Sequence, residues 1–184
     1  MKIILLSGWS QSGKDTLGAR LVAEHEYKRF AFADPVKDVA ASLYGFDRKL
    51  ADTQEGKATV VPQRNWLMPA GRTVREWVIQ VGEDRKKVHG AGVWAEQIAE
   101  RILAAPSFRG RYVITDWRFP EELAALQKKL PAAAEFYPVR LVRPGQRVSP
   151  VGSATEYALS GFPMPAFNAV DEADWERLKE YLGL

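Results

Sequence analysis

The residues with the clearest potential for chemistry lie between Gly8 and Thr16, in the stretch GWSQSGKDT. Gly8 and Gly13 are spaced so that the backbone between them can curl and turn its N–H groups toward an anion. Lys14 follows at once and adds a mobile positive charge for the outermost phosphates of a nucleotide. Asp15 stands where the strict pattern has Ser or Thr, with the threonine one position later, so direct magnesium binding by this stretch is left open. The pattern predicts a phosphate-binding loop (P-loop).

Such a loop requires a buried strand before it and a helix after it, and the flanking sequence predicts both. Residues 2–7 are almost continuously apolar, as in a central parallel strand that is covered on both faces. From about residue 14 to residue 26, apolar side chains recur at helical spacing. The positive end of that helix would point at the bound anion. The alternative is a glycine-rich turn that leads into an ordinary helix and leaves Lys14 solvated.

Asp116 is the second position of interest, because it directly follows the apolar stretch from Arg111 to Thr115. A carboxylate at the end of a strand in a P-loop protein can hold a hydrated magnesium ion or orient an acceptor. Arg118 would project over the same edge of the sheet, where open α/β sheets bind their ligands. Asp116 can also serve as the N-cap of a helix that begins near Arg118, and the two roles are compatible.

Further strands and helices alternate along the rest of the chain. Strand patterns cover residues 27–33, 138–142 and 166–170, and helical patterns cover 36–44, 73–81, 93–104, 123–130 and 173–182. Asp34 is placed as an N-cap before the first of these helices, and Gly82 is expected to end the second. Between residues 45 and 71 the periodicity fails, which indicates a long excursion that covers a substrate. The five short strands separated by helices predict an α/β fold with a doubly wound parallel sheet, in a single domain, residues 1–184.

Composition narrows the classes of function. The chain has 184 residues, a formal net charge of +3 and a sequence pI of about 9.1, an excess of basic residues too small to indicate nucleic-acid binding by itself. It has no cysteine, which excludes disulfides, thiolate metal sites and a cysteine nucleophile. His25 and His89 are the only histidines, so a histidine metal site or a Ser-His-Asp triad has little support. No stretch has the length of a signal-peptide core or a membrane span, so we expect a cytoplasmic protein with no membrane partner.

Several motifs occur in an order that resembles a known family. They are GWSQSGKDT, FADPVK from Phe32, REWVIQVGEDR from Arg75, Trp94, and ITDWRFPEE from Ile114. Together they resemble the bacteriophage-type deoxynucleoside monophosphate kinases, which are P-loop phosphotransferases of the nucleoside monophosphate kinase group. The resemblance extends from residue 1 to about residue 125 and weakens after residue 142. There, Glu156 lacks the usual preceding histidine and Asp171 stands in place of an asparagine of the family pattern.

The resemblance implies an adenylate-kinase-like fold and transfer of the γ-phosphoryl group of ATP to a deoxynucleoside monophosphate, with Mg²⁺ required. The implied ATP-binding residues are Gly8, Ser10, Gln11, Ser12, Gly13, Lys14, Asp15 and Thr16, and the implied Mg²⁺ ligands, direct or through water, are Thr16 and Asp116. The implied catalytic residues are Lys14, Asp116, Arg118, Arg143 and Arg147. The implied acceptor-binding residues are Phe32, Asp34, Lys37, Arg75, Gln80, Arg85, Trp94 and Glu156. Residues 45–105 would form an acceptor-binding insertion and residues 143–165 a lid-like segment.

Two other functions are compatible with the sequence. One is a P-loop kinase of another small acceptor, such as a coenzyme precursor or a sugar acid, which would share the loop and the arginines. The other is a P-loop nucleotide-binding module that works with nucleic acid, against which stand the modest charge and the lack of a basic stripe with interleaved aromatic residues. We therefore expect a small-molecule partner, no stable nucleic-acid partner, and either a monomer or a homodimer, in the host cytoplasm if a phage encodes the chain.

Overall fold

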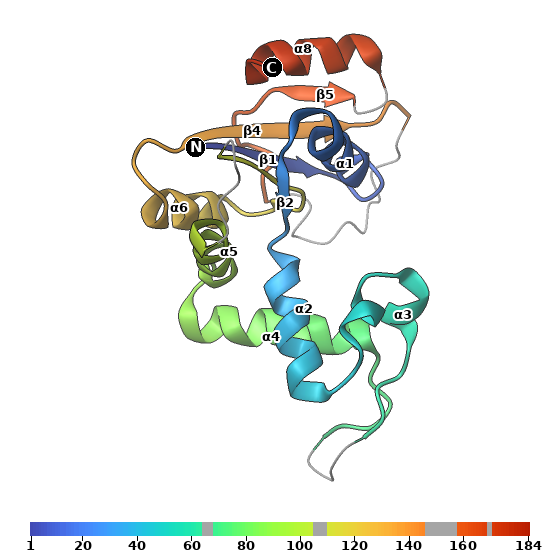
Figure 1. Ribbon diagram of the computed structural model, residues 1–184. Coiled ribbons are helices and arrows are strands. Elements are labelled where there is room, and N and C mark those ends of the chain that lie inside the picture. The colour runs from blue at the N-terminus through green and yellow to red at the C-terminus, as the bar shows by residue number, and fades with distance from the viewer. Residues whose placement is uncertain (64–67, 105–109, 146–157, 169–170) are drawn as a thin grey trace. The chain divides into compact units, whose positions relative to one another are not determined.

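The computed structural model describes residues 1–63, 68–104, 110–145, 158–168 and 171–184. The chain divides into two compact units (Figure 1). The first unit consists of Met1–Phe32 and Ala95–Leu184, and the second unit consists of Ala33–Trp94. The second unit thus starts and ends earlier along the chain than the insertion that we predict at residues 45–105.

The first unit is built on a five-stranded sheet with the strand order β2-β3-β1-β4-β5. The strands are β1 (Lys2–Gly8), β2 (Lys28–Phe30), β3 (Arg111–Ile114), β4 (Glu135–Val142) and β5 (Ala166–Asn168). Each pair of neighbours runs parallel. This confirms the predicted α/β class and the five-stranded parallel sheet, although β2 is shorter and β4 longer than their sequence patterns indicate.

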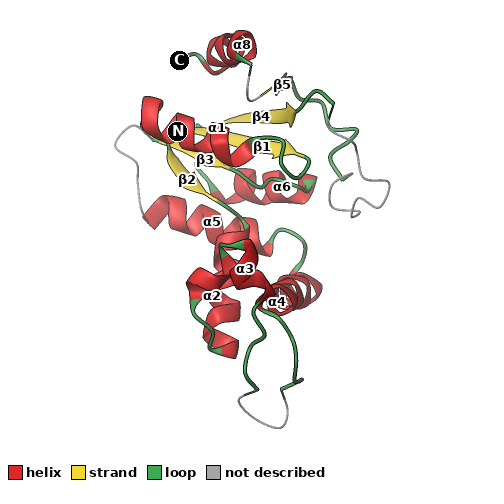
Figure 2. Ribbon diagram, turned by 90° about the vertical axis from the view of Figure 1, so that its right-hand side faces the viewer, coloured by secondary structure: helices red, strands yellow, loops and turns green. Residues whose placement is uncertain are grey.

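Helices cover both faces of this sheet (Figure 2). On one face lie α1 (Lys14–His25) and α8 (Glu172–Leu182), and on the other lie α5 (Val93–Ala104) and α6 (Pro120–Lys129). Because successive side chains of a strand point to opposite faces, β1 supplies both cores. Ile3 and Leu5 pack in the core that contains residues of α5 and α6, and Ile4 and Leu6 pack in the core that contains residues of α1 and α8. This two-sided burial explains the continuous apolar run of β1.

The helix that follows the predicted P-loop lies very close to the sheet. A Cβ atom at Gly18, in α1, would lie 2.6 Å from Cγ2 of Thr115, the residue directly after β3. Thr115 is buried, with 2% of its surface exposed. Only glycine lets α1 pack this closely at the carboxyl end of β3, so Gly18 fixes the position of the helix that carries the loop.

The second unit consists of four helical segments in the part of the chain that the structure describes. They are α2 (Ala33–Tyr44), the 3₁₀ helix η1 (Arg48–Ala51), α3 (Gln54–Ala58) and α4 (Val74–His89). Buried apolar residues of this unit form two cores of their own. The predicted excursion at residues 45–71 thus contains two short helices, η1 and α3, that its lack of periodicity did not indicate. Side-chain caps hold both turns, with Asp47 accepting from the backbone of Lys49 and Thr53 from that of Gly56.

Two predicted helix boundaries in this unit are wrong. Helix α4 continues through Gly82 to His89, and its C-cap is Gly90, which has a φ of 93°. Gly82 is buried, and a Cβ atom there would lie 3.5 Å from Cγ1 of Val36, so packing against α2 outweighs the low helix propensity of glycine. Helix α2 begins at Ala33, which places Asp34 in its first turn instead of at the N-cap. Among the described residues, no helix combines the length and apolar character that crossing a membrane would need.

Candidate phosphate-binding site

The chain between β1 and α1 forms a loop whose glycines are required by its geometry. Gly8 has a φ of +144°, and a Cβ atom there would lie 2.4 Å from the carbonyl oxygen of Leu141 and 2.6 Å from Oγ of Ser12. Gly13 has a φ of 93° and is the N-cap of α1. Larger residues at these two positions would be strained in the backbone, and at Gly8 they would also collide with β4. The glycine spacing in the sequence therefore marks a real tight loop.

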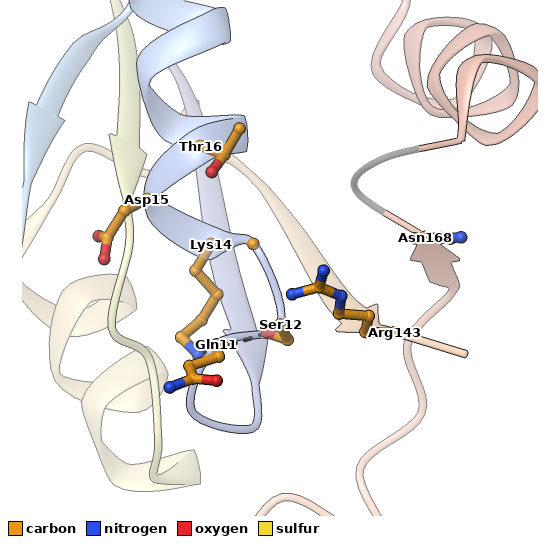
Figure 3. A pocket seen from close by; sticks show the side chains of 8 residues that line it. Gln11, Ser12, Lys14, Asp15, Thr16, Arg143 and Asn168 are labelled. Atoms are coloured by element: carbon orange, nitrogen blue, oxygen red, sulfur yellow. Dashed lines mark hydrogen bonds between the residues drawn. The ribbon is translucent and has the colours of Figure 1, made fainter. Parts of the chain in front are cut away.

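The first turn of α1 borders a cavity of about 220 Å³ (Figure 3). The lining residues are Gln11, Ser12, Gly13, Lys14, Asp15, Thr16, Arg143 and Asn168. No side chain caps the start of α1, so the positive end of the helix dipole faces the cavity without a side-chain acceptor at the N-cap. A helix N-terminus of this kind stabilises a bound phosphate.

Lys14 holds its ammonium group inside the curve of the loop. Its Nζ atom donates to the carbonyl oxygens of Gly8 at 2.7 Å and Trp9 at 2.6 Å, and it lies 3.4 Å from Oγ of Ser12. Phosphate oxygens are charged and therefore accept stronger hydrogen bonds than backbone carbonyls. The ammonium group of Lys14 therefore lies where it can replace a hydrogen bond to a carbonyl oxygen with one to a phosphate oxygen.

Arg143 and Asn168 reach the same cavity from two neighbouring strands. Arg143 directly follows β4 and is exposed, and its guanidinium group extends toward the loop (Figure 3). Asn168 is the last residue of β5, and its backbone N–H donates to Oδ2 of Asp174 at 2.8 Å. Both come from the carboxyl edge of the sheet, where α/β sheets bind ligands. The predicted Arg143 therefore lies at the loop, whereas Arg147 and Glu156 lie outside the described residues.

Sequence reasoning missed Asn168 as a lining residue. The NAVD stretch that begins there resembles a guanine-reading motif only superficially, since it lacks the lysine. The available signal was its position at the end of the last strand pattern, because every strand of a parallel sheet that ends beside a P-loop brings its final residue to the same edge. Asp15 lines the cavity too, but its carboxylate lies on the side of α1 away from Arg143 (Figure 3).

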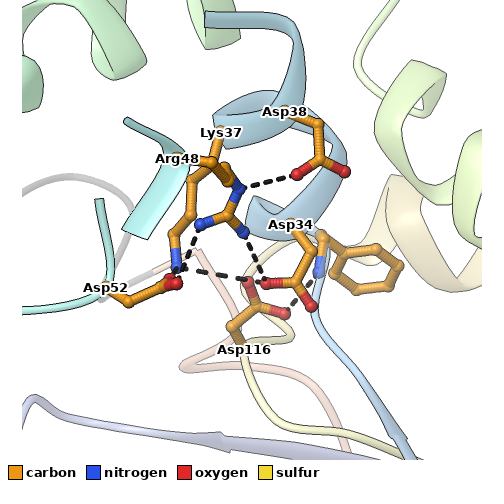
Figure 4. A network of polar contacts seen from close by, with 7 residues as sticks. Asp34, Lys37, Asp38, Arg48, Asp52 and Asp116 are labelled. Carbon is orange, nitrogen blue, oxygen red and sulfur yellow. Dashed lines mark hydrogen bonds and ion pairs between the residues drawn. The ribbon is translucent and has the colours of Figure 1, made fainter. Parts of the chain in front are cut away.

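Asp116 lies just beyond β3, as predicted, and connects two strand ends. Its Oδ1 atom accepts a hydrogen bond of 2.7 Å from the backbone N–H of Phe32 (Figure 4). The alternative role of Asp116 as a helix N-cap is not observed, because the N-cap of α6 is Phe119. The backbone N–H groups of Arg118 and Phe119 instead donate to the buried carboxylate of Glu122. The side chain of Arg118 is exposed.

A magnesium ion that arrives with a nucleotide fits the residues of this edge. In the described part of the chain, no group of three or more His, Asp or Glu side chains is arranged to hold a metal ion. Mg²⁺ usually keeps several waters and binds one or two carboxylates together with substrate phosphates. Thr16 lines the cavity and Asp116 lies at the end of β3, and a hydroxyl and a carboxylate are oxygen ligands of the kind that Mg²⁺ binds. That the two hold one ion stays a prediction.

The predicted acceptor residues on α4 are polar and accessible to different degrees. Arg75 is exposed and donates from Nη2 to Oε1 of Gln54 at 2.8 Å. Arg85 is exposed as well. Gln80 is half-buried and accepts a hydrogen bond from Arg72, a residue that sequence reasoning did not select. These side chains belong to the second unit.

The two predicted aromatic residues are core residues. Phe32 has 4% of its surface exposed and packs in a core of the first unit. Trp94 has 2% exposed, packs in a core of the second unit, and donates from Nε1 to the carbonyl oxygen of Gly82 at 3.2 Å. Their observed role is packing, and a role in stacking on a base stays a prediction that this burial does not favour.

Asp34 and Lys37 belong to a charged network centred on Arg48 (Figure 4). Arg48 contacts the carboxylates of Asp38 at 2.6 Å, Asp52 at 2.9 Å and Asp34 at 3.6 Å. Lys37 pairs with Asp52 at 2.9 Å. Burial alone would raise the pKa of Asp52, but hydrogen bonds from Lys37 and Arg48 outweigh it and lower that pKa. The predicted acceptor residues Asp34 and Lys37 are thus already engaged in ion pairs.

The fold and the loop together define an α/β protein with a glycine-rich loop between its first strand and its first helix. No protein-family model matches the chain, and no curated protein matches it. Among solved structures, the chain is similar to a sugar kinase from Janibacter sp. HTCC2649, with 15% identity, 100% of this chain and 95% of that chain covered, and a TM-score of 0.48. It is similar to a gluconokinase from Sinorhizobium meliloti 1021, with 16% identity, 99% and 90% covered, and a TM-score of 0.45.

A shikimate kinase from Bacteroides thetaiotaomicron is similar at the same level, with 15% identity, 99% of this chain and 98% of that chain covered, and a TM-score of 0.46. Likenesses this distant carry no information about a substrate. The chemistry of the chain has to be argued from its own residues.

Proposed function

We propose that the chain is an ATP-dependent phosphotransferase that transfers the γ-phosphoryl group of ATP to a deoxynucleoside monophosphate. The observation that carries this proposal is the cavity at the start of α1, where the loop, Lys14 and Arg143 converge. Two cationic side chains and a helix N-terminus around one cavity suit a polyanion such as the triphosphate of ATP. ATP is therefore assigned to the first unit.

The reaction itself requires positioning and charge more than covalent participation by the protein. Lys14 would move from the loop carbonyls to the β and γ phosphates, and Arg143 would stabilise the charge that develops on the transferring group. Thr16 and Asp116 would hold Mg²⁺, which supplies neutralisation of the phosphate charge when it is bound. The absence of cysteine and the scarcity of histidine are compatible with this reaction, since no nucleophilic side chain is needed.

The acceptor assignment is supported by the ordered motifs of the sequence and by the polar residues of α4. Arg75 and Arg85 are exposed cations on one helix, and Gln80 is a half-buried amide on the same helix. A monophosphate acceptor needs a cation for its phosphate and hydrogen-bonding groups for its base. Helix α4 offers both kinds of group.

A second acceptor class is favoured by the network around Arg48. Three carboxylates, those of Asp34, Asp38 and Asp52, surround two cations, Arg48 and Lys37. A cluster with this balance suits hydroxyl groups better than a second phosphate. A sugar acid or a coenzyme precursor that presents a hydroxyl as the phosphoryl acceptor is therefore the alternative.

A coupled assay of ADP release decides between the two classes. The protein, ATP and Mg²⁺ are incubated with all deoxynucleoside and ribonucleoside monophosphates, and in parallel with sugar acids, shikimate and coenzyme precursors. Conversion of at least one monophosphate is the expected result. Conversion of the hydroxyl acceptors alone would move the assignment to the second class. If nothing is converted and the protein is retained on DNA in a salt-dependent manner, both kinase assignments are wrong.

A further inference from the structure

A chain of hydrogen bonds that starts at Arg72, just before α4, and continues along that helix fixes the orientation of one amide side chain. Arg72 donates from Nη1 to Oε1 of Gln80, and Gln80 donates from Nε2 to Oδ2 of Asp84 at 3.1 Å. Gln80 and Asp84 are four residues apart on α4, so their side chains lie on one face of the helix. We call these three residues the amide relay.

The chemistry of the two partners leaves the amide a single arrangement. A guanidinium group can only donate, so it must face the amide oxygen. An ionised carboxylate can only accept, so it must face the amide nitrogen. An isolated glutamine can rotate by half a turn and exchange its donor with its acceptor, but in the amide relay such a rotation would break both hydrogen bonds.

The surroundings keep the relay in place. The guanidinium group of Arg72 lies over the ring of Trp77, 5.0 Å from its centroid, and Trp77 stacks on Tyr44 with a centroid distance of 3.7 Å. Burial raises the pKa of Tyr44, with Asp84 raising it further and Arg72 opposing, so the phenol lies within electrostatic reach of both ends of the relay. Lys87 lies 3.6 Å from Oδ1 of Asp84, the carboxylate oxygen that the relay does not use.

A locked amide can discriminate between two classes of nucleobase. It retains one N–H donor and one lone pair of the oxygen beyond those that the relay uses. Adenine and cytosine present an amino donor beside a ring nitrogen acceptor, whereas guanine and thymine present an oxo acceptor beside a ring N–H donor. In one binding pose, a fixed amide can form both hydrogen bonds with one class of base. With the other class it places donor against donor and acceptor against acceptor. A rotating amide can pair with either class.

We propose that Arg72 and Asp84 are positioning residues that hold the amide of Gln80 in one orientation, so that the acceptor site selects amino bases from oxo bases or the reverse. This inference rests on the proposed monophosphate acceptor. Arg72 and Asp84 act through Gln80 and contact no reacting atom.

The test compares base selectivity in four proteins. The wild type, Asp84→Asn, Asp84→Glu and the control Lys87→Gln are assayed for kcat/KM, and by calorimetric binding, with dAMP, dCMP, dGMP and dTMP. The wild type is expected to favour one class at least about tenfold over the other. Asp84→Asn, which can donate as well as accept, is expected to narrow that ratio at least about threefold with the KM for ATP unchanged. Asp84→Glu and Lys87→Gln are expected to keep the wild-type ratio.

Each other outcome has a defined meaning. Conversion of monophosphates without a class preference in the wild type overturns the inference and leaves the proposed function intact. An Asp84→Asn ratio equal to the wild-type ratio does the same, provided that its melting temperature shows a folded protein. If no monophosphate binds or is converted while a hydroxyl acceptor is, the proposed acceptor and the inference both fall.

Discussion

The ammonium group of Lys14 is held in the loop by weak acceptors that a phosphate group could replace. Its ammonium group is held by the carbonyl oxygens of Gly8 and Trp9, which are weaker acceptors than phosphate oxygens. The same contacts explain why the loss of Lys14 should affect the reaction more than the fold, since they are polar contacts of one half-buried side chain.

We expect Lys14→Met to lower kcat/KM for phosphoryl transfer by roughly 10² to 10⁴, because it removes a cation aimed at the transferring phosphates. The melting temperature should stay close to that of the wild type. Lys28→Met is the matched control, because Lys28 is exposed and begins β2. It therefore lies at the amino ends of the parallel strands, whereas the loop lies at their carboxyl ends. Turnover of Lys14→Met near the wild-type level would contradict a P-loop mechanism.

Protonation of Asp52 provides a second test at the scale of residues. Its pKa is lowered in the folded chain, so its ion pairs stabilise the fold above the unfolded pKa of about 3.9 and stop doing so as the pH falls through the folded pKa. Asp52→Asn should therefore be less stable than the wild type at neutral pH. The difference should shrink as the pH falls below about 4, measured as denaturant midpoints. A difference independent of pH would assign the effect to packing.

The elements differ in how far their sequence alone reveals them. Strand β1 was predictable because burial on both faces requires an apolar residue at nearly every position. The short helices η1 and α3 were not, because each depends on a local cap and on tertiary contacts, with no periodic pattern. The end of α4 was misplaced because a glycine in a helix interior reads as a stop, whereas packing against α2 decides its state.

The candidate site was predictable to the extent that its residues are adjacent in sequence. The loop from Gly8 to Thr16 carries its own signature, and in the structure Arg143 lines the same cavity as the loop. Asn168, Arg72 and Asp84 carry no motif. Their significance comes from neighbours that are distant along the chain or on another turn of a helix.

Glycine at position 18 gives a test of how closely α1 must approach the sheet. Gly18→Ala places a Cβ atom 2.6 Å from Cγ2 of Thr115, a buried β-branched residue that cannot easily move. We expect a loss of about 1–3 kcal/mol in the free energy of unfolding, despite the better helix propensity of alanine. Urea unfolding measures it.

Two further variants control this experiment. Gly82→Ala introduces the same methyl group in α4, where the nearest atom lies at 3.5 Å, and should be neutral or stabilising by up to about 1 kcal/mol. Thr115→Ser removes the methyl group in conflict and should recover part of the stability of Gly18→Ala. Equal effects of the alanine at both glycines would mean that close packing of α1 is not the reason for Gly18.

At the scale of the whole molecule, the candidate residues for the two substrates belong to different units. The phosphate-binding loop and Arg143 lie in the first unit, and Arg75, Gln80 and Arg85 lie in the second. Substitutions in one group of residues should therefore change the KM mainly for one of the two substrates. This separation offers a kinetic test that a structural role of a residue would not imitate.

We expect Arg75→Lys to raise the KM for the monophosphate at least about tenfold, while the KM for ATP changes less than about threefold. Lysine keeps the charge but loses the paired hydrogen bonds by which arginine grips a phosphate. Arg75 also bonds to Gln54, so Gln54→Ala is assayed beside it. If both KM values stay unchanged in a normally folded Arg75→Lys protein, the acceptor phosphate binds elsewhere, and Arg85 and Arg118 are the next residues to examine.

The central place of β1 in the sheet has a consequence for how the chain acquires its structure during synthesis. Lys2 pairs with Arg111 on one side and with Glu135 on the other, so β1 gains its two neighbours only after both of these later segments have been synthesised. Residues 33–94 form a contiguous unit with cores of their own and can become ordered earlier. Until β3 and β4 have emerged, the apolar strand that carries the loop is unpaired on both edges, and nascent chains that stop before residue 135 are the ones most exposed to aggregation and to capture by chaperones.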